Sequence, residues 1–168
     1  KVGLIGHSTG GEWVTDAAVT LENDNNPPMG VGLIAPVPLS RVSVPVLVIH
    51  GTRDHACQVG TEPLGVYCVA DAPKYLVVMT GANHFGYTDG ICLDPTQQRN
   101  DRCWYFDPWG LLPEAEGWDN ASRVGGAEGQ AAHARQQRAA GNYLQAFFSH
   151  YLDLPGKAGA LNNLRQKT

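Results

Sequence analysis

Three residues that could act together in catalysis, Ser8, Asp54 and His84, each follow closely after a run of apolar residues. A serine hydroxyl is a weak nucleophile until a neighbouring base removes its proton. An imidazole can be that base, and a carboxylate can hold the imidazole in the correct tautomer and stabilise its charged form. The three side chains together therefore predict nucleophilic attack by Ser8 on an acyl group, with His84 as the base and Asp54 as the group that orients it.

Ser8 lies in the G-x-S-x-G pattern formed by residues 6–10, between an apolar segment and a segment with helical periodicity. This pattern is typical of a nucleophile elbow, a tight turn from a strand into a helix. We expect glycine to be required at positions 6 and 10, because a side chain at either position would keep the strand and the helix apart. The backbone N–H of Thr9, directly after the nucleophile, is the expected donor to an oxyanion.

Hydrophobic patterning predicts an α/β protein with a mainly parallel sheet flanked by helices, because short apolar runs alternate with helical segments. The expected strands are residues 2–6, 31–35, 46–50 and 75–80, and the expected helices are residues 9–21, 62–70 and 128–152. The carboxyl ends of parallel strands share one edge of a sheet, so Ser8, Asp54 and His84 can converge there. The buried face of the first helix is expected to carry Trp13, Val14, Ala17, Ala18 and Leu21.

Other histidines and acids compete for these roles. His55 adjoins the acid loop and is the alternative base, and Asp89, five residues beyond His84, is the alternative acid. His50 lies inside a predicted strand and is expected in the core. His7 precedes the nucleophile in the elbow; we expect its side chain to point away from the serine and to contribute to substrate binding.

The segments GHSTGG, VPVLVIHGTRD and GANHFGYTD resemble the elbow, the acid strand and the histidine loop of the α/β-hydrolase superfamily. The resemblance spans residues 1–154, and within the superfamily it is to dienelactone hydrolases, chlorophyllases and cutinase-like polyester hydrolases. It implies a serine esterase that acts on a small-molecule or polymeric ester through an acyl-enzyme, without a metal or an organic cofactor. The alternatives are an amidase or peptidase with the same triad, and a non-catalytic half-domain that needs a partner chain.

The same resemblance implies that this chain is the carboxyl-terminal half of an α/β-hydrolase fold, because the superfamily has several strands before the elbow. A second oxyanion donor normally comes from a loop after one of those strands. We expect the open side of the elbow strand to be completed by the missing amino-terminal half, by a second copy, or by a rearranged segment of residues 87–128. Residues 155–168 are interpreted as a tail.

Residues 87–128 form an aromatic, cysteine-containing insertion with little periodicity. Because the insertion follows His84, it could line the substrate cleft, and Trp104 and Trp109 are candidate substrate contacts. The alternative is a disulfide-pinned flap that packs on the core.

The four cysteines, Cys57, Cys68, Cys92 and Cys103, allow three disulfide pairings. We expect the sequential pairing, Cys57–Cys68 and Cys92–Cys103, because it closes two short loops. Disulfides would indicate a secreted or periplasmic protein, and the alternative is a cytoplasmic protein with free thiols. The cysteine and histidine spacings do not match a zinc site.

The composition fits one globular domain with a core: 168 residues, of which 43% are hydrophobic and 17% charged. The formal net charge of −4 and the lack of a basic cluster argue against nucleic acid as a partner. No apolar run in the sequence approaches the roughly 20 residues that a membrane-spanning helix needs.

Overall fold

The structure is a computed structural model, and it describes residues 1–37, 40–52, 54, 63–71, 73–82, 84–87, 127–154 and 162. All the predicted strands and helices are present, with bounds that differ by a few residues. In chain order they are β1 (Leu4–His7), α1 (Thr9–Asn23), β2 (Val31–Ile34), β3 (Val46–Gly51), α2 (Pro63–Val69), β4 (Lys74–Met79), the short 3-10 helix η1 (Phe85–Tyr87) and α5 (Ala127–Tyr151).

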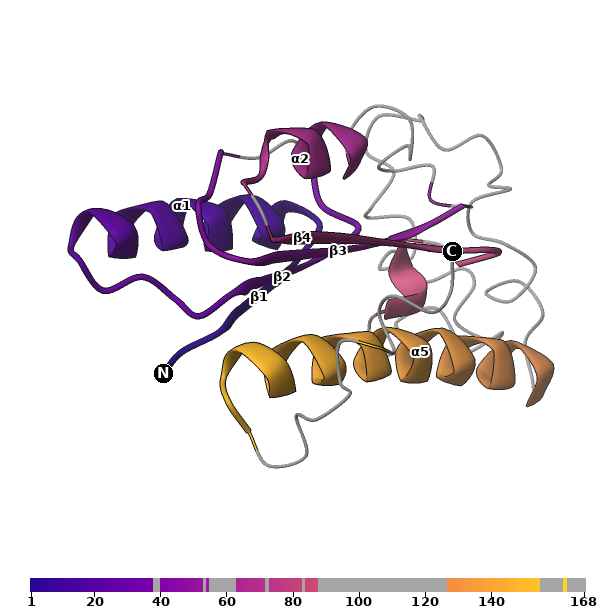
Figure 1. Cartoon of the computed structure of the whole chain (residues 1–168). Coiled ribbons are helices and arrows are strands. Elements are labelled where there is room, and N and C mark those ends of the chain that lie inside the picture. The colour runs from indigo at the N-terminus through magenta and orange to yellow at the C-terminus, as the bar shows by residue number, and fades with distance from the viewer. Residues whose placement is uncertain are drawn as a thin grey trace.

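The strands form a parallel sheet in the order β1-β2-β3-β4, in which each strand pairs with the next one along the chain. Helices α1 and α2 cover one face of the sheet, and α5 covers the other (Figure 1). The predicted α/β class, a parallel sheet flanked by helices, is therefore confirmed. The carboxyl ends of all the strands lie along one edge of this sheet, as parallel pairing requires.

Strand β3 is buried over its whole length and divides the core into two halves. Successive residues of a strand point to opposite faces. Val46 and Val48 therefore pack on the side of α1, and Leu47 and Ile49 pack against Phe147 of α5. Each such fully buried side chain contributes roughly 1.5–3 kcal/mol. Tyr143, Phe148 and Tyr151 of α5 are partly buried and pack against the same part of the core.

Helix α1 faces the sheet with small residues, which corrects the predicted buried face. Ala18 is fully buried as expected, but its buried companions are Gly11 and Thr15. Trp13, which we expected inside, is 71% exposed. At 100° per residue, Trp13 lies on the side opposite to Gly11 and Thr15. Ala17 is also exposed, whereas Val14 and Leu21 are half-buried.

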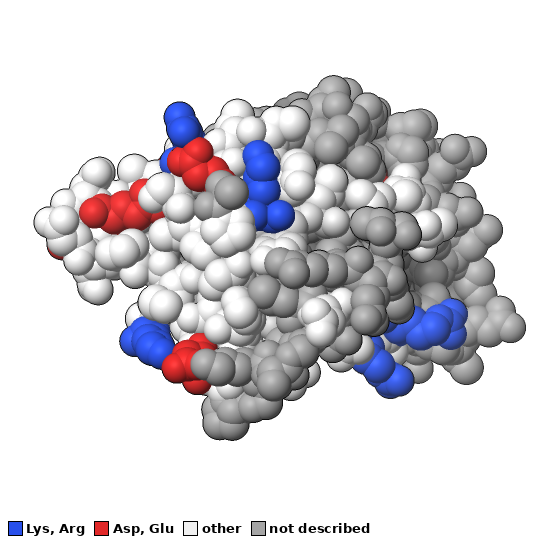
Figure 2. All heavy atoms as spheres, viewed as in Figure 1, with Lys and Arg blue, Asp and Glu red and all other residues white. Residues whose placement is uncertain are grey.

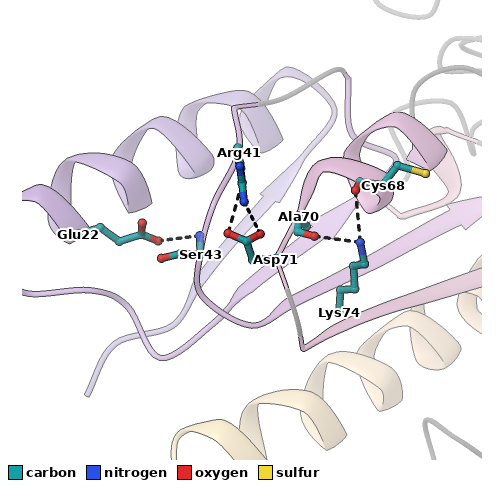
Figure 3. A network of polar contacts seen from close by, with 7 residues as sticks. All are labelled: Glu22, Arg41, Ser43, Cys68, Ala70, Asp71 and Lys74. Carbon is teal, nitrogen blue, oxygen red and sulfur yellow. Dashed lines mark hydrogen bonds and ion pairs between the residues drawn. The ribbon is translucent and has the colours of Figure 1, made fainter.

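A group of polar contacts joins the end of α2 to the segment before β3 and to the start of β4 (Figure 3). The Arg41 guanidinium donates to both carboxylate oxygens of Asp71, at 2.7 and 3.3 Å. Lys74 Nζ donates to the backbone oxygens of Ala70 (2.9 Å) and Cys68 (3.3 Å), at the carboxyl end of α2. A lysine at this position satisfies terminal carbonyl groups and complements the helix dipole.

Cys68 is an exposed free cysteine in the structure. This contradicts the predicted Cys57–Cys68 disulfide: α2 presents the Cys68 side chain to solvent, without a bonded sulfur. Cys57, Cys92 and Cys103 lie outside the described residues, so the Cys92–Cys103 disulfide stays a prediction, as does export of the protein. Most of the aromatic insertion, with Trp104 and Trp109, also lies outside the described residues.

Strand β1 is an edge strand of the sheet, and no strand among the described residues pairs with its outer side. The N–H groups of Leu4 and Ser8 donate inward, to the oxygens of Gly30 and Ile34. Since neighbouring residues of a strand alternate in direction, the backbone groups of Ile5 point to the open side. The Ile5 side chain is 51% exposed, and that of Val2 is 58% exposed.

The surface of the described residues carries charges of both signs. On the face that Figure 2 shows, acidic and basic side chains lie intermixed in small groups. Among the described residues, no helix is both long enough and apolar enough to cross a membrane.

Candidate active site

Ser8 occupies the turn between β1 and α1 with a strained backbone. Its φ is 55° and its ψ is −130°, and a serine rarely adopts a positive φ. Such a conformation costs about 1–3 kcal/mol and persists only where the surrounding structure enforces it. Here the backbone N–H of Ser8 donates to the backbone oxygen of Ile34 at 3.0 Å, and the backbone oxygen of Ser8 accepts from the N–H of Gly11 at 2.8 Å.

The Ser8 hydroxyl makes no helix-capping hydrogen bond, although a serine at the start of a helix usually makes one. The side chain is partly accessible. A serine nucleophile needs a hydroxyl that does not cap the helix and that a substrate can reach.

Gly6 is required where the strand and the helix approach each other. A Cβ atom on Gly6 would lie 2.2 Å from the backbone oxygen of Gly10 and 2.7 Å from the nitrogen of Gly11. The steric prediction for Gly6 is thus confirmed. It is wrong for Gly10, because a Cβ atom there would meet no atom within 4 Å. Gly10 points away from the strand, at the second position of α1.

Gly6→Ala is therefore expected to destabilise the protein by about 3 kcal/mol or more, because backbone atoms cannot move aside as a flexible side chain can. Gly10→Ala is the matched control and should be neutral, or stabilising by up to about 1 kcal/mol, because alanine is the better helix former. Denaturant unfolding of both variants measures the difference. Equal stabilities would contradict the close approach at Gly6.

Asp54 and His84 form a buried pair. The Nδ1–H of His84 donates to Oδ2 of Asp54 at 2.8 Å, and the two residues are 5% and 3% exposed. A carboxylate only accepts hydrogen bonds, so this contact places the proton of a neutral imidazole on Nδ1. The Nε2 atom then carries the lone pair, which is the form that a general base needs.

Two further side chains, those of His50 and Tyr87, lie near Asp54. His50 is fully buried in β3, and its Nε2 lies 3.9 Å from Oδ2 of Asp54. Tyr87 belongs to η1, and its hydroxyl donates to Sδ of Met79 at 4.0 Å. Burial, and secondarily the Asp54 charge, raise the pKa of Tyr87 above its ordinary value, so its phenol stays neutral. The expected core position of His50 is confirmed.

His7 connects the elbow to the histidine loop. Its Nε2–H donates to the backbone oxygen of His84 at 2.9 Å, and the two imidazole rings lie 4.8 Å apart, centroid to centroid. Because Ser8 is the next residue, this bond brings the elbow and His84 side by side across 77 positions of sequence. Sequence reasoning missed this contact, because nothing in the chain marks which backbone oxygen an imidazole will bind.

The structure thus gathers the predicted residues at one edge of the sheet. Ser8 directly follows β1, Asp54 follows β3, and His84 follows β4. The loops after β3 and β4 are joined by the Gly81 N–H, which donates to the Thr52 hydroxyl at 2.9 Å. The alternative residues His55 and Asp89 lie outside the described residues.

The amino-terminal end of α1 lies at the same edge, and the first N–H groups of a helix have no partner within that helix. Thr9 begins α1 directly after Ser8, so its N–H remains the expected oxyanion donor. Within the described ranges, no group of three or more His, Cys, Asp or Glu side chains is arranged to hold a metal ion.

The search of solved structures found an esterase domain from a Rhodothermus marinus protein. It is 21% identical, with a TM-score of 0.41, and the match covers 49% of this chain and 50% of that one. This chain therefore spans about half the length of that domain. No protein-family model matches the sequence. No curated protein is significantly similar to it.

Proposed function

We propose that the protein is a serine hydrolase of the α/β-hydrolase type, which cleaves carboxylic esters with Ser8, His84 and Asp54. The observation that carries this proposal is the buried hydrogen bond between His84 and Asp54, held beside a strained serine turn. Ser8, Asp54 and His84 follow three different strands, and their positions at one edge of the sheet support the proposal. Strained backbone conformations are common at active sites, so the conformation of Ser8 supports a functional role for this residue.

In the proposed reaction, Nε2 of His84 takes the proton of Ser8 as Oγ attacks the ester carbonyl. The Thr9 N–H stabilises the developing oxyanion. The imidazolium then gives its proton to the leaving alcohol, which departs as the acyl-enzyme forms. A water molecule, activated by the same imidazole, attacks the acyl-enzyme and releases the acid and free Ser8. Asp54 remains ionised and stabilises the imidazolium throughout.

Short p-nitrophenyl esters test this proposal, because their activated leaving group makes few demands on the binding site. Hydrolysis that depends on Ser8 would support it. Faster turnover of the matching p-nitroanilides would instead favour the amidase alternative. A protein that folds but hydrolyses neither substrate would favour the non-catalytic half-domain.

The open side of β1 leads to a second part of the proposal: a further strand pairs with this edge in the functional protein. Exposed backbone groups beside apolar side chains make such an edge prone to pairing or aggregation. We propose an amino-terminal segment of the same protein as the partner, with a second copy of this chain or a segment of residues 87–128 as the alternatives. Such an amino-terminal segment would also supply the second oxyanion donor, whose loss typically costs about 10²–10³-fold in rate.

Residues 1–168 expressed alone are therefore expected to associate or aggregate and to turn over esters slowly. Light scattering across a concentration series measures the association. Ile5→Lys should reduce it, because a charge on an edge strand opposes pairing. Val69→Lys, at an exposed apolar residue of α2, is the matched control and should change little. A soluble, cooperatively melting monomer with normal turnover would show that the prediction is wrong.

A further inference from the structure

We propose that His7 is a positioning residue: its imidazole holds the backbone of His84 at a fixed distance from the nucleophile. This inference rests on the proposed function, because it assigns a role within the same site. It replaces the sequence-based expectation of a substrate contact with a contact to the catalytic machinery.

The hydrogen bond itself defines the state of the ring. The backbone oxygen of His84 can only accept, so the proton must be on Nε2 of His7. The two imidazoles are therefore in opposite tautomers, since His84 carries its proton on Nδ1. A neutral His7 would leave its Nδ1 as an acceptor.

The hydrogen bond from His7 to His84 connects two parts of the sheet that are not neighbours. Strands β1 and β4 are separated in the sheet by β2 and β3, so no ladder hydrogen bond joins the elbow strand to the strand before His84. The 2.9 Å bond from His7 spans that gap and ends on the base residue itself. Because Ser8 directly follows His7, the bond restrains the separation between nucleophile and base.

The environment of His7 keeps it neutral. Burial, followed by the charge of His84, lowers the pKa of His7 below its ordinary value of 6.5, although the backbone hydrogen bond and Asp54 partly oppose this. Among the described residues, Tyr87 is a further titratable group near His7, with ring centroids 6.2 Å apart, and its phenol is neutral. A neutral His7 adds no positive charge beside the imidazolium that His84 becomes during the reaction.

Two substitutions separate positioning from substrate binding. His7→Gln keeps a nitrogen donor near the position of Nε2, whereas His7→Phe keeps a ring and removes the donor. We expect His7→Gln to stay within a few-fold of wild type, and His7→Phe to lose about 10²-fold in kcat with little change in KM, the scale of a small misplacement of reacting groups. A rise in KM with unchanged kcat in both variants would overturn the proposal.

Two further measurements do not depend on activity. Nitrogen-15 NMR of the wild-type protein should show His7 as the Nε2–H tautomer, and an Nδ1–H tautomer would overturn the proposal. Unfolding at pH 7 and pH 5 tests the neutral state. The unfolded His7 binds a proton below about pH 6.5, while the folded one resists it, so this contribution to stability is lost as the pH falls.

The free energy of unfolding of wild type, relative to that of His7→Gln, should therefore fall between pH 7 and pH 5. A relative free energy of unfolding that rises on acidification would contradict the neutral state of His7.

The two proposals can be rejected separately. Ester hydrolysis that survives Ser8→Ala would reject the proposed function. Normal kcat in a folded His7→Phe variant, with hydrolysis still dependent on Ser8, would reject only the positioning role.

Discussion

Ser8→Ala is expected to lower kcat for ester hydrolysis by on the order of 10⁶-fold, the scale seen when a catalytic serine is removed. The side chain that forms the acyl-enzyme is lost, and the remaining groups can only bind the substrate and stabilise an oxyanion. Stability should change little, because the Ser8 hydroxyl does not cap α1. Initial rates with a short p-nitrophenyl ester, together with thermal melting, measure both effects.

Ser40→Ala is the matched control for this experiment. Ser40 is exposed, and its hydroxyl donates to Asp16 at 2.8 Å, remote in sequence from the three proposed catalytic residues. It should hydrolyse the ester at the wild-type rate. A Ser8→Ala protein that retains more than about a tenth of the wild-type kcat would remove Ser8 from the mechanism.

Asp54→Asn is expected to lower kcat by about 10⁴-fold while KM stays close to the wild-type value. The amide has the same shape as the carboxylate, but it carries no charge to stabilise the imidazolium. Its NH₂ group can also donate to Nδ1 of His84, which moves the ring proton to Nε2 and blocks the base. The burial of the pair makes both effects large, because no solvent can replace the carboxylate.

Asp71→Asn is the control for Asp54, because Asp71 also pairs with a basic group but lies at the surface near α2. It should leave ester hydrolysis unchanged. If Asp54→Asn also kept its activity, the acid role would pass to another carboxylate, with Asp89 as the first candidate. Asp89→Asn would then show the loss expected for Asp54.

The strands and the site residues could be predicted because their signals are local. The apolar run of residues 46–49 before Asp54 is buried on both faces of the sheet, and a nearly continuous apolar run is typical of such a strand. Parallel strands place their carboxyl ends together, so chain order was enough to expect Asp54 beside His84. Gly6 followed from the elbow pattern, since one backbone must pass close to another there.

The errors concern contacts that depend on distant parts of the chain. The sequence of α1 does not show how closely the helix approaches the sheet, and Gly11 and Thr15 allow an approach that leaves Trp13 in solvent. The direction of the Cys68 side chain depends on how α2 sits on the sheet. The bond from His7 to His84 forms only when the loop after β4 folds over the elbow.

The most direct test of the account is mass spectrometry after treatment with a fluorophosphonate, which reacts covalently with activated serines. The test uses the natural protein that contains these residues. We predict one adduct, on the peptide that carries Ser8, and none in Ser8→Ala or His84→Ala variants. Folded protein that carries no adduct, or an adduct on any other serine, would contradict it.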